Sequence, residues 1–312
     1  MSSPEDIIVC IPVYNDWESV QLLLAQFEQL VNETGLSLSV LLVNDASSEK
    51  PQLTLAAETR VRVDILELRR NVGHQRAITL GLTHLYQTRQ ASAVVVMDAD
   101  GEDRVEDIAA LHRRFEELGR ARAVFAARRR RTEGLTFQLG YRAYQGLHWC
   151  LTGERVEVGN FSILPWEYLT TLVVVSEMWS HYAAAVRVSK LPTEQLPLDR
   201  GYRLRGQSKM NLVSLVTHGL RAILAYEQVS VRIMAGSIGL SLLALLFALP
   251  LAFVSNGAPW LYLGLLAIAT LVLVSGTFVL VTLQARSSSQ FIPLRDFQYF
   301  VLGSHRLSPP RT

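Results

Sequence analysis

Over about the first 200 residues, short continuous apolar runs alternate with stretches in which apolar residues recur at helical spacing. Uninterrupted apolar runs are typical of strands covered on both faces of a sheet, and helical spacing predicts helices between them. The expected strands are Ile7–Val13, Leu38–Val43, Val61–Leu66, Ala93–Met97 and Ala123–Ala127, and the expected helices are Glu18–Val31, Gln75–Tyr86 and Val105–Leu118. The alternation predicts an α/β domain with a doubly wound, mostly parallel sheet over residues 1–209.

Towards the C-terminus the pattern changes to one long apolar run. Between Ile233 and Ala285 there is no Asp, Glu, Lys, Arg or His. A helix needs about 20 apolar residues to cross a bilayer, and this run has room for two such helices. The turn-forming sequence Ser255–Pro259 separates them, so we expect transmembrane helices at about Ile233–Phe253 and Trp260–Leu283. The alternative is a pair of buried core helices.

Charge on the flanks of this run, residues 233–285, predicts its orientation. Arginines lie on both sides of it: Arg221, Arg232, Arg286 and Arg295. Positive charge on both flanks places both ends in the cytoplasm, with residues 286–312 as a cytoplasmic tail. Residues 210–232 have apolar positions at helical spacing beside basic residues. They predict a helix lying in the membrane interface or, as the alternative, an amphipathic helix packed on the α/β domain.

Composition adds to this picture. The chain is 49% hydrophobic with a mean hydropathy of +0.21, at the apolar edge for a soluble protein, and its net charge of +2 gives no case for a nucleic-acid partner. Cys10 and Cys150 cannot build a disulfide framework, and Cys10 reads as a buried thiol in a reducing compartment. The polar start, Met1–Asp6, has no signal-peptide pattern, so we expect the α/β domain on the cytoplasmic face of the cytoplasmic membrane.

Residues that could bind a ligand or take part in catalysis follow three of the predicted strands at the point where each ends. The first strand leads into Pro12-Val13-Tyr14-Asn15, the second into Asn44-Asp45, and the fourth into Asp98-Ala99-Asp100. Because ligands bind beyond the carboxyl ends of the strands in such sheets, we expect these three segments to converge on one crevice.

Asp98 and Asp100 carry the clearest chemistry in that crevice. Alternate residues leaving a strand can point to the same side, and two carboxylates can share one divalent cation, Mg²⁺ or Mn²⁺, that also binds a diphosphate. The alternative is a solvated loop with helix-capping aspartates. Asp45 either accepts hydrogen bonds from a nucleotide base or ribose, or makes a turn.

Three other segments have residues suited to binding phosphate groups. Asn71-Val72-Gly73 precedes a predicted helix whose N-terminus can face phosphate, with a turn and cap as the alternative. Basic residues and their neighbours form two groups, Arg128 with Arg131, and Arg203 with Arg205, Ser208 and Lys209. Such groups bind phosphate or, beside a membrane, anionic lipid headgroups; a solvated surface is the alternative for the middle members of the cluster Arg128–Arg131.

In order and spacing, Ile11–Asn15, Val43–Ser47, Asn71–Gly73 and Asp98–Asp100 resemble glycosyltransferase family 2. The resemblance covers about Ile7–Asp107 and implies a GT-A fold that binds a UDP- or GDP-linked sugar. It implies that Asp98 and Asp100 hold the metal and diphosphate and that Asp45 contacts the nucleoside. The implied nucleotide-sugar contacts are Pro12, Tyr14, Asn15, Asp45, Asn71, Gly73 and Asp98.

The second half is similar to the polyprenyl-phosphate branch of this family, which includes dolichol-phosphate mannose synthase. The similarity rests on Arg128 and Arg131, on the segment Arg203–Lys209, and on the predicted amphipathic helix and two-helix anchor. It implies a polyprenyl phosphate or another membrane lipid as acceptor. The residues implied to surround the phosphates or the lipid headgroup are Arg128, Arg131, Arg203, Arg205, Ser208 and Lys209.

Departures from the family pattern mark a divergent subgroup. The Gly-Asp-Phe segment of the family, whose aspartate is a proposed catalytic base, is Gly159-Asn160-Phe161 here, and an amide cannot act as a base. A phosphate acceptor, with a second pKa of about 6, is already largely ionised at neutral pH and needs none. A hydroxyl acceptor needs a base, and the available candidates, in addition to Asp100, are Glu102, Asp103 and Glu177.

We therefore expect an inverting, membrane-anchored glycosyltransferase that moves a sugar from a nucleotide-diphosphate sugar to a polyprenyl phosphate at the cytoplasmic face. The alternatives are transfer to a lipid or glycan hydroxyl and a catalytically inactive membrane scaffold. The sequence lacks the Gln-x-x-Arg-Trp motif of processive synthases and the glycine fingerprint of a Rossmann enzyme. It leaves the sugar, the nucleotide and the formation of a homo-oligomer open.

Overall fold

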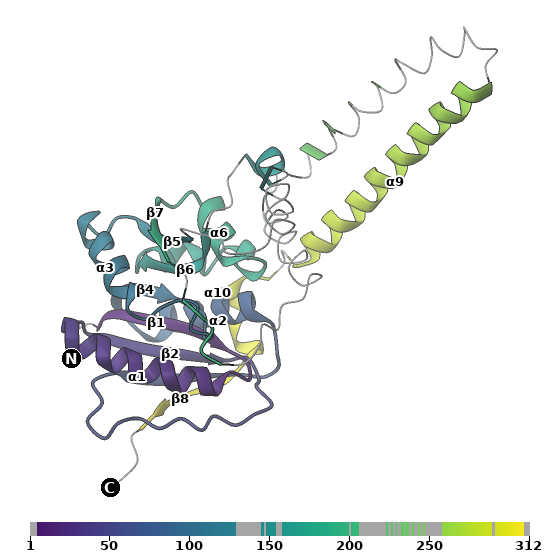
Figure 1. Ribbon diagram of the computed structural model, residues 1–312. Helices are drawn as coiled ribbons and strands as arrows, with labels where there is room; N and C mark the ends of the chain where they lie inside the picture. The colour runs from purple at the N-terminus through teal and green to yellow at the C-terminus, as the bar shows by residue number, and fades with distance from the viewer. Residues whose placement is uncertain are drawn as a thin grey trace. The chain divides into compact units, whose positions relative to one another are not determined.

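A computed structural model describes residues 5–128, 145–146, 148–153, 158–199, 201–205, 258–288 and 291–308, with isolated positions between 223 and 246 (Figure 1). By their internal contacts the residues form two compact units. The first comprises Met1–Gly134, Glu157–His218 and Phe291–Thr312. The second comprises Leu135–Val156 and Gly219–Gln290. Each unit is described by itself.

The described part of the first unit forms an eight-stranded sheet. In chain order its strands are β1 Glu5–Val13, β2 Leu38–Asn44, β3 Arg62–Leu68, β4 Ala91–Val96, β5 Ala123–Arg128, β6 Val158–Pro165, β7 Thr193–Leu198 and β8 Val301–Leu307. Their spatial order is β7-β5-β6-β4-β1-β2-β3-β8. β1, β2, β3 and β4 are parallel, as are β5 and β7, whereas β6 runs antiparallel to β4 and β5, and β8 runs antiparallel to β3.

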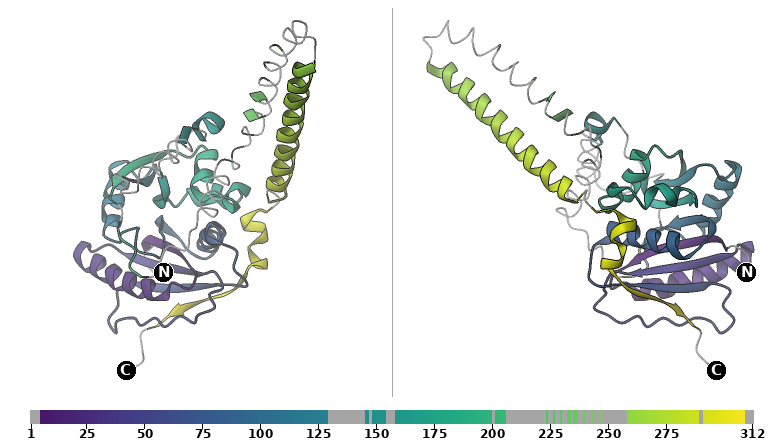
Figure 2. Two further views of the ribbon diagram at one scale, coloured as in Figure 1. Left: turned by 45° about the vertical axis from the view of Figure 1, so that its right-hand side comes forward. Right: turned by 180° about the vertical axis from the view of Figure 1, so that it is seen from behind.

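The five predicted strands are confirmed, and so is the mostly parallel sheet: among the described strands, only β6 and β8 run against the direction of the others. Three further strands, β6, β7 and β8, were not predicted from the apolar pattern. β8 contains Gly303, Ser304, His305 and Arg306, a polar sequence without strand periodicity. Its strand conformation comes from pairing with the open edge of β3, which satisfies backbone groups that would otherwise be unpaired (Figure 2).

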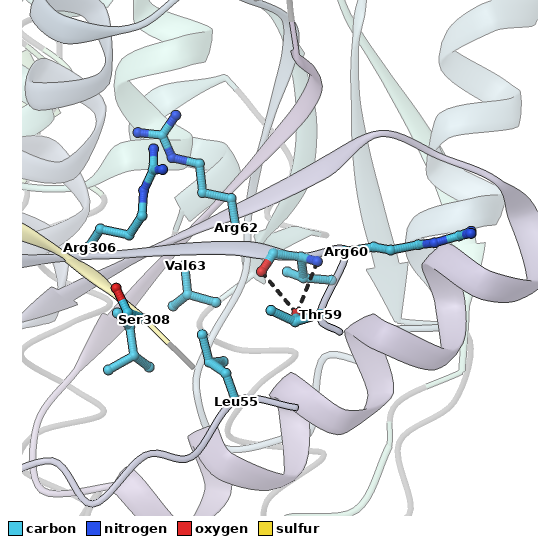
Figure 3. A pocket seen from close by; sticks show the side chains of 9 residues that line it. Leu55, Thr59, Arg60, Arg62, Val63, Arg306 and Ser308 are labelled. Atoms are coloured by element: carbon cyan, nitrogen blue, oxygen red, sulfur yellow. Dashed lines mark hydrogen bonds between the residues drawn. The ribbon is translucent and has the colours of Figure 1, made fainter. Parts of the chain in front are cut away.

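A hollow of about 370 Å³ opens where β8 meets the start of β3 (Figure 3). Its lining includes Leu55, Arg62, Val63 and Arg306. Arg62 is the first residue of β3, so the hollow lies at the amino end of the parallel strands. Ligands of such sheets bind at the carboxyl ends, so this hollow is separate from the expected crevice.

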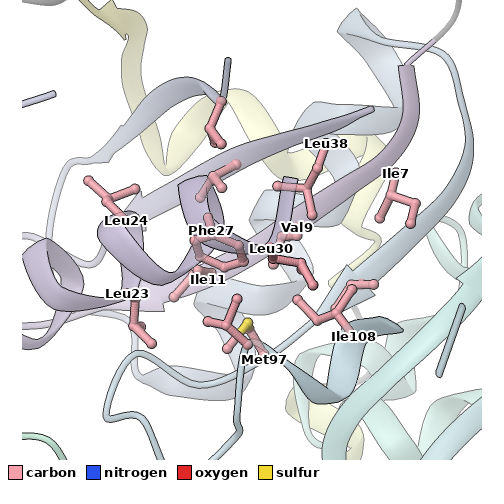
Figure 4. Packing of buried hydrophobic residues seen from close by; sticks show 14 of the residues in the cluster. Ile7, Val9, Ile11, Leu23, Leu24, Phe27, Leu30, Leu38, Met97 and Ile108 are labelled. Carbon is pink, nitrogen blue, oxygen red and sulfur yellow. The ribbon is translucent and has the colours of Figure 1, made fainter. Parts of the chain in front are cut away.

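Helices cover both faces of the sheet. They are α1 Trp17–Thr34, α2 His74–Thr88, α3 Asp107–Glu117, α5 Tyr168–Leu172, the 3-10 turn η1 Ser176–Trp179, and α6 Tyr182–Val188. Phe27 of α1 and Phe115 of α3 pack in one cluster with Val9 of β1. Figure 4 shows α1 side chains against β1 in this cluster. The predicted helices are therefore confirmed in position.

The opposite face holds the second cluster, which includes Cys10 of β1, Ile78 of α2 and Tyr182 of α6. Neighbouring residues of β1 thus point to opposite faces, and both are buried, as the continuous apolar run predicts. Cys10 is fully buried, as expected, and burial raises the pKa of its thiol to about 12. The thiol is therefore a packing group.

The C-terminal segment, part of the predicted cytoplasmic tail 286–312, packs onto the α/β unit. It contains α10 Pro293–Asp296 and η2 Phe297–Tyr299 before β8. The ring of Trp179 stacks on Phe291 with centroids 3.6 Å apart, and Phe300 lies 4.9 Å from Trp179. The Arg69 backbone N–H donates to the Phe300 carbonyl over 2.8 Å. Aromatic packing and backbone pairing together hold this segment against the domain.

In the second unit, helix α9 spans Ala258–Ser288 and covers the second predicted membrane helix. Many of its apolar side chains are exposed, among them Leu261, Leu263, Leu265, Leu266, Ile268 and Val272. Residues 210–232 and Ile233–Phe253 lie almost entirely outside the described residues. Where single positions are described, Arg232 Nη1 donates to the Leu151 carbonyl over 3.1 Å.

Among the described residues, the structure contains no helix with both the length and the apolar character needed to cross a membrane.

Candidate functional site

The carboxyl end of β4 carries Asp98 and Asp100, as the sequence predicts. β4 lies beside β1, the strand next to β2, so the ends of these three strands share one edge of the sheet. The Asp98 side chain is 38% exposed and that of Asp100 is 15% exposed. The pair is therefore accessible from the edge where α/β sheets bind ligands.

Two of the candidate bases stabilise the loop that holds this pair. The Asp98 backbone N–H donates to Asp103 Oδ2 over 2.9 Å, and the Glu102 N–H donates to Asp100 Oδ1 over 3.0 Å. The Asp103 carboxylate thus caps the backbone of the loop that carries Asp98. Glu102 stabilises this loop through its backbone, because its carbonyl also accepts a hydrogen bond from the Gly201 N–H over 2.9 Å.

Arg203 reaches Asp100 from a distant part of the sequence. Its Nη2 donates to Asp100 Oδ2 over 2.8 Å, and its Nη1 lies 3.8 Å from Asp16 Oδ2. The Leu204 N–H donates to the Asp100 carbonyl over 2.9 Å, so backbone pairing supports the ion pair. The structure thereby places a predicted phosphate ligand beside a predicted metal ligand.

Two glycines permit the close approach of these segments. Gly101 has a positive φ of 83°, and a Cβ there would overlap the Leu204 side chain. A Cβ at Gly201 would lie 2.8 Å from the Gly101 carbonyl oxygen. Only glycine meets these requirements without strain.

Asp45 organises the loop Asn71–Gly73. Its Oδ1 accepts from the Val72 N–H over 2.7 Å, and its Oδ2 accepts from the Gly73 N–H over 2.9 Å. Burial raises the pKa of the Asp45 carboxyl, and these two backbone donors partly offset that rise. The two roles predicted for Asp45 were a turn and a contact to a nucleotide base or ribose. Both fit this geometry, because the carboxylate shapes the loop and the residue lies at the end of β2.

The segment after β1 forms a turn against the segment after β2. Asn15 has a positive φ of 51°, and its side chain donates from Nδ2 to Ser48 Oγ over 2.9 Å. Pro12 is buried in β1, whereas the Tyr14 side chain is 44% exposed at the strand end. The three predicted residues are thus brought to the same edge as Asp45.

His74 also lies at this site, although it was not among the residues predicted from the sequence. Its Nε2 lies 2.9 Å from Asp98 Oδ1. Burial lowers the pKa of His74, but the carboxylates of Asp98, Asp100 and Asp45 outweigh it, so the pKa is raised overall. Its neighbour Gln75 donates from Nε2 to Asn160 Oδ1 over 3.2 Å. The signal available in the sequence was the position of His74 and Gln75 in the first turn of the helix after Gly73.

Several predicted residues are not joined to this group. Arg131, Ser208 and Lys209 lie outside the described residues, and Arg128 is described only as the last backbone position of β5. Arg205 is exposed. Glu177 lies in η1, where its carboxylate accepts from Ser176 Oγ over 3.2 Å, and no described hydrogen bond joins it to Asp98 or Asp100. The roles predicted for these residues stay predictions.

The donor set at β4 suits a divalent cation. No group of three or more His, Cys, Asp or Glu side chains able to hold a metal occurs within the described residues. Mg²⁺ and similar ions are commonly held by one or two carboxylates together with substrate phosphates and water. Asp98 and Asp100 supply that protein share, and Arg203 adds a cation for phosphate, so the residues fit a metal-bound diphosphate.

A family model described as "Glycosyl transferase family 2" matches residues 8–180, more than half of the 312 residues. An uncharacterised glycosyltransferase of Synechocystis sp. is 23% identical over 253 residues, covering 78% of this chain and 76% of that protein. The uncharacterised glycosyltransferase YkcC of Bacillus subtilis is 31% identical over 131 residues, covering 41% and 38%.

Another relative is the undecaprenyl-phosphate 4-deoxy-4-formamido-L-arabinose transferase of Klebsiella pneumoniae, which is 32% identical over 114 residues, or 36% of this chain and 34% of that protein. The chain thus matches little more than a third of this relative and of YkcC. Among solved structures, mannosyl-3-phosphoglycerate synthase from Rubrobacter xylanophilus aligns at 16% identity with a TM-score of 0.48 over 70% of this chain and 72% of that one. Glucosyl-3-phosphoglycerate synthase from Mycobacterium tuberculosis, in complex with Mn²⁺, UDP-glucose and phosphoglyceric acid, aligns at 14% identity with a TM-score of 0.49 over 71% and 78%.

Proposed function

The chain belongs to glycosyl transferase family 2 and is a glycosyltransferase, and from this premise we propose that it transfers a sugar from a nucleotide-diphosphate sugar to a polyprenyl phosphate at the cytoplasmic membrane surface. The observation that carries the proposal is the Asp98/Asp100 pair at the end of β4 with Arg203 bonded to Asp100 over 2.8 Å. Carboxylates and a guanidinium side by side suit a metal-bound diphosphate.

On the donor side, the strand ends supply the proposed contacts. Asp45 and the loop that it holds at Val72 and Gly73 would flank the nucleoside. Asp98 and Asp100 would hold a divalent cation, Mg²⁺ or Mn²⁺, which neutralises charge on the departing nucleotide diphosphate when it is bound. Arg203 would contact the diphosphate, since its fork of N–H donors matches phosphate oxygens.

On the acceptor side, two observations support a lipid phosphate. One relative acts on undecaprenyl phosphate by its name, although the match covers a limited part of both proteins. The residue at the position of the family's proposed base is Asn160, which cannot take a proton from a hydroxyl. A phosphate is already largely ionised at neutral pH and attacks the anomeric carbon without a base, with inversion of configuration.

Attachment to the membrane is the remaining part of the proposal. It is supported by the uncharged run from Ile233 to Ala285, by arginines on both of its flanks, and by the exposed apolar side chains of α9. An acceptor with a lipid tail would then reach the Asp98/Asp100 site without leaving its leaflet. Extraction of native membranes with alkaline carbonate tests this part, because release of the full-length protein into the supernatant would contradict it.

The central experiment supplies membranes that contain the full-length protein with radiolabelled UDP- and GDP-sugars and a polyprenyl phosphate. We expect label to enter the organic extract in an acid-labile form. Asp100→Asn should abolish the transfer, whereas Glu58→Gln, an exposed acid outside the site, should not. Full activity of Asp100→Asn would refute the metal assignment, and an acid-stable lipid product would point to a hydroxyl acceptor.

A further inference from the structure

The register of the sheet places Asn160 at the same edge as the acidic pair. Asn160 lies near the start of β6, which runs antiparallel to β4 with Ser162 opposite Val96. Continuing that register by two residues sets Asn160 across from Asp98. The side chain that replaces the family's proposed base therefore lies beside the predicted reaction centre.

Gln75 has a fixed amide orientation. Its Oε1 accepts a hydrogen bond from the Tyr182 backbone N–H over 2.7 Å. A backbone N–H can only donate, so this bond directs the Gln75 oxygen towards Tyr182 and leaves its NH₂ group for other partners. That NH₂ group lies 3.2 Å from Asn160 Oδ1 and 3.4 Å from His74 Nδ1. Gln75 is buried, so water does not compete readily for these bonds.

The orientation of Gln75 determines that of Asn160. Because Gln75 presents N–H groups, Asn160 presents its oxygen in return, and its own NH₂ group points elsewhere. Among the described residues, none accepts a hydrogen bond from Asn160 Nδ2. The Asn160 carbonyl accepts from Ser162 Oγ over 2.8 Å, and that hydroxyl also bonds to Tyr182 Oη over 2.7 Å, so the backbone is held as well.

We propose that Asn160 donates a hydrogen bond to an anionic oxygen of a phosphate-monoester acceptor, and that Gln75 is the positioning residue that turns the amide towards it. The inference rests on the proposed function and assigns a residue to acceptor recognition. An acceptor oxygen forms the bond to the anomeric carbon as the bond from that carbon to the leaving diphosphate oxygen breaks. No proton leaves the nucleophile, so a donor serves where a hydroxyl acceptor would need a base.

Two variants test the orientation by separate routes. Asn160→Asp keeps the shape and the bond from Gln75 but presents a carboxylate to the acceptor. Gln75→Glu keeps an oxygen for the Tyr182 N–H but presents a second oxygen to Asn160, whose NH₂ group must then turn inward. Both variants should lose the donor facing the acceptor, although Asn160 itself is unchanged in the second.

The measurement is the dissociation constant of the detergent-solubilised full chain for geranyl phosphate, and geraniol is the uncharged analogue for comparison. UDP and GDP with Mn²⁺ serve as control ligands. We expect wild-type protein to prefer geranyl phosphate over geraniol, and both variants to bind geranyl phosphate about ten-fold more weakly, because each loses a hydrogen bond to a charged group. The affinity for the nucleotides should change by less than about two-fold. They serve as a control because an unspecific effect of the new charge would weaken the binding of these anions too.

The outcomes separate this inference from the proposed function. Undiminished preference for geranyl phosphate in either variant, with nucleotide binding retained as proof of folding, overturns the role of Asn160 and leaves the proposed function standing. An equal loss for geranyl phosphate and nucleotide also overturns it. Wild-type protein that binds geraniol as tightly as geranyl phosphate overturns the phosphate acceptor, and with it both proposals. If one variant does not fold, the other decides.

Discussion

Arg203 donates from Nη2 to Asp100 Oδ2 over 2.8 Å, which joins two residues 103 positions apart in the sequence. Arg203 is partly buried, and its Nε is buried without a described hydrogen-bond partner. The guanidinium is therefore held at the end of β4 mainly through the terminal nitrogens and the neighbouring backbone bond of Leu204.

Arg203→Met should lower kcat/KM for sugar transfer by about ten- to one hundred-fold, because it removes a charge-assisted contact worth roughly 1.5–3 kcal/mol. Arg203→Lys should give an intermediate loss, since a lysine keeps the charge but not the planar fork. Steady-state kinetics of the purified full-length protein measure both. Arg113→Met, an exposed arginine on α3, is the matched control and should retain wild-type kinetics. Wild-type kinetics for Arg203→Met would remove this residue from the site.

Gly101→Ala should destabilise the loop after β4. The positive φ of 83° disfavours any side chain, and the added Cβ would overlap Leu204, so we expect a loss of roughly 1–3 kcal/mol in the free energy of unfolding. Denaturant titration gives the value. Gly303→Ala in β8 is the control, because a Cβ there meets nothing within 4 Å. Equal effects of the two substitutions would contradict the close packing of Gly101 on Leu204.

Trp179→Ala should weaken the attachment of the C-terminal segment. Trp179 is only 6% exposed, stacks on Phe291 and packs at a tilt against Phe300, so its truncation should cost about 3–5 kcal/mol of stability, as for other large buried aromatics. Limited proteolysis should then cleave first within residues 291–308. Tyr299→Ala, which removes a 68% exposed ring from the same segment, should leave both stability and cleavage unchanged. Resistance of Trp179→Ala to cleavage would show that β8 pairing suffices.

His84 should make stability depend on pH. Burial, with the nearby Arg89, lowers the pKa of His84, and its ring stacks on Phe297 at 6.1 Å. The fold thus favours the neutral ring, so this stabilisation is complete above the unfolded-state pKa of about 6.5 and is lost as the pH falls from there through the lower folded-state pKa. Thermal unfolding between pH 8 and about pH 5 should show the loss, and His84→Gln should make that slope shallower.

The matched control for this pH series is His305→Gln, which replaces an exposed histidine of β8. It should leave the slope of the wild-type protein unchanged. An equal flattening by both substitutions would mean that the dependence arises from another group.

Local sequence determined the first half of the fold. The apolar runs at β1, β2 and β4 are continuous because both faces of these strands are buried, as Val9 and Cys10 illustrate in opposite clusters. Strand type and helix position followed from that pattern without any long-range information. The placement of Asp98 and Asp100 followed in turn, because strand ends in such a sheet share one edge.

Only the tertiary structure decided the parts that depend on partners distant in the sequence. β8 is polar and became a strand because β3 offered an open edge. Nothing in the sequence links Gln75 with Asn160, because 85 positions separate them. Their orientation depends on one backbone N–H at Tyr182. A periodic pattern reports which face of an element is buried, whereas hydrogen-bond direction depends on which group lies opposite, and that is set when the chain packs.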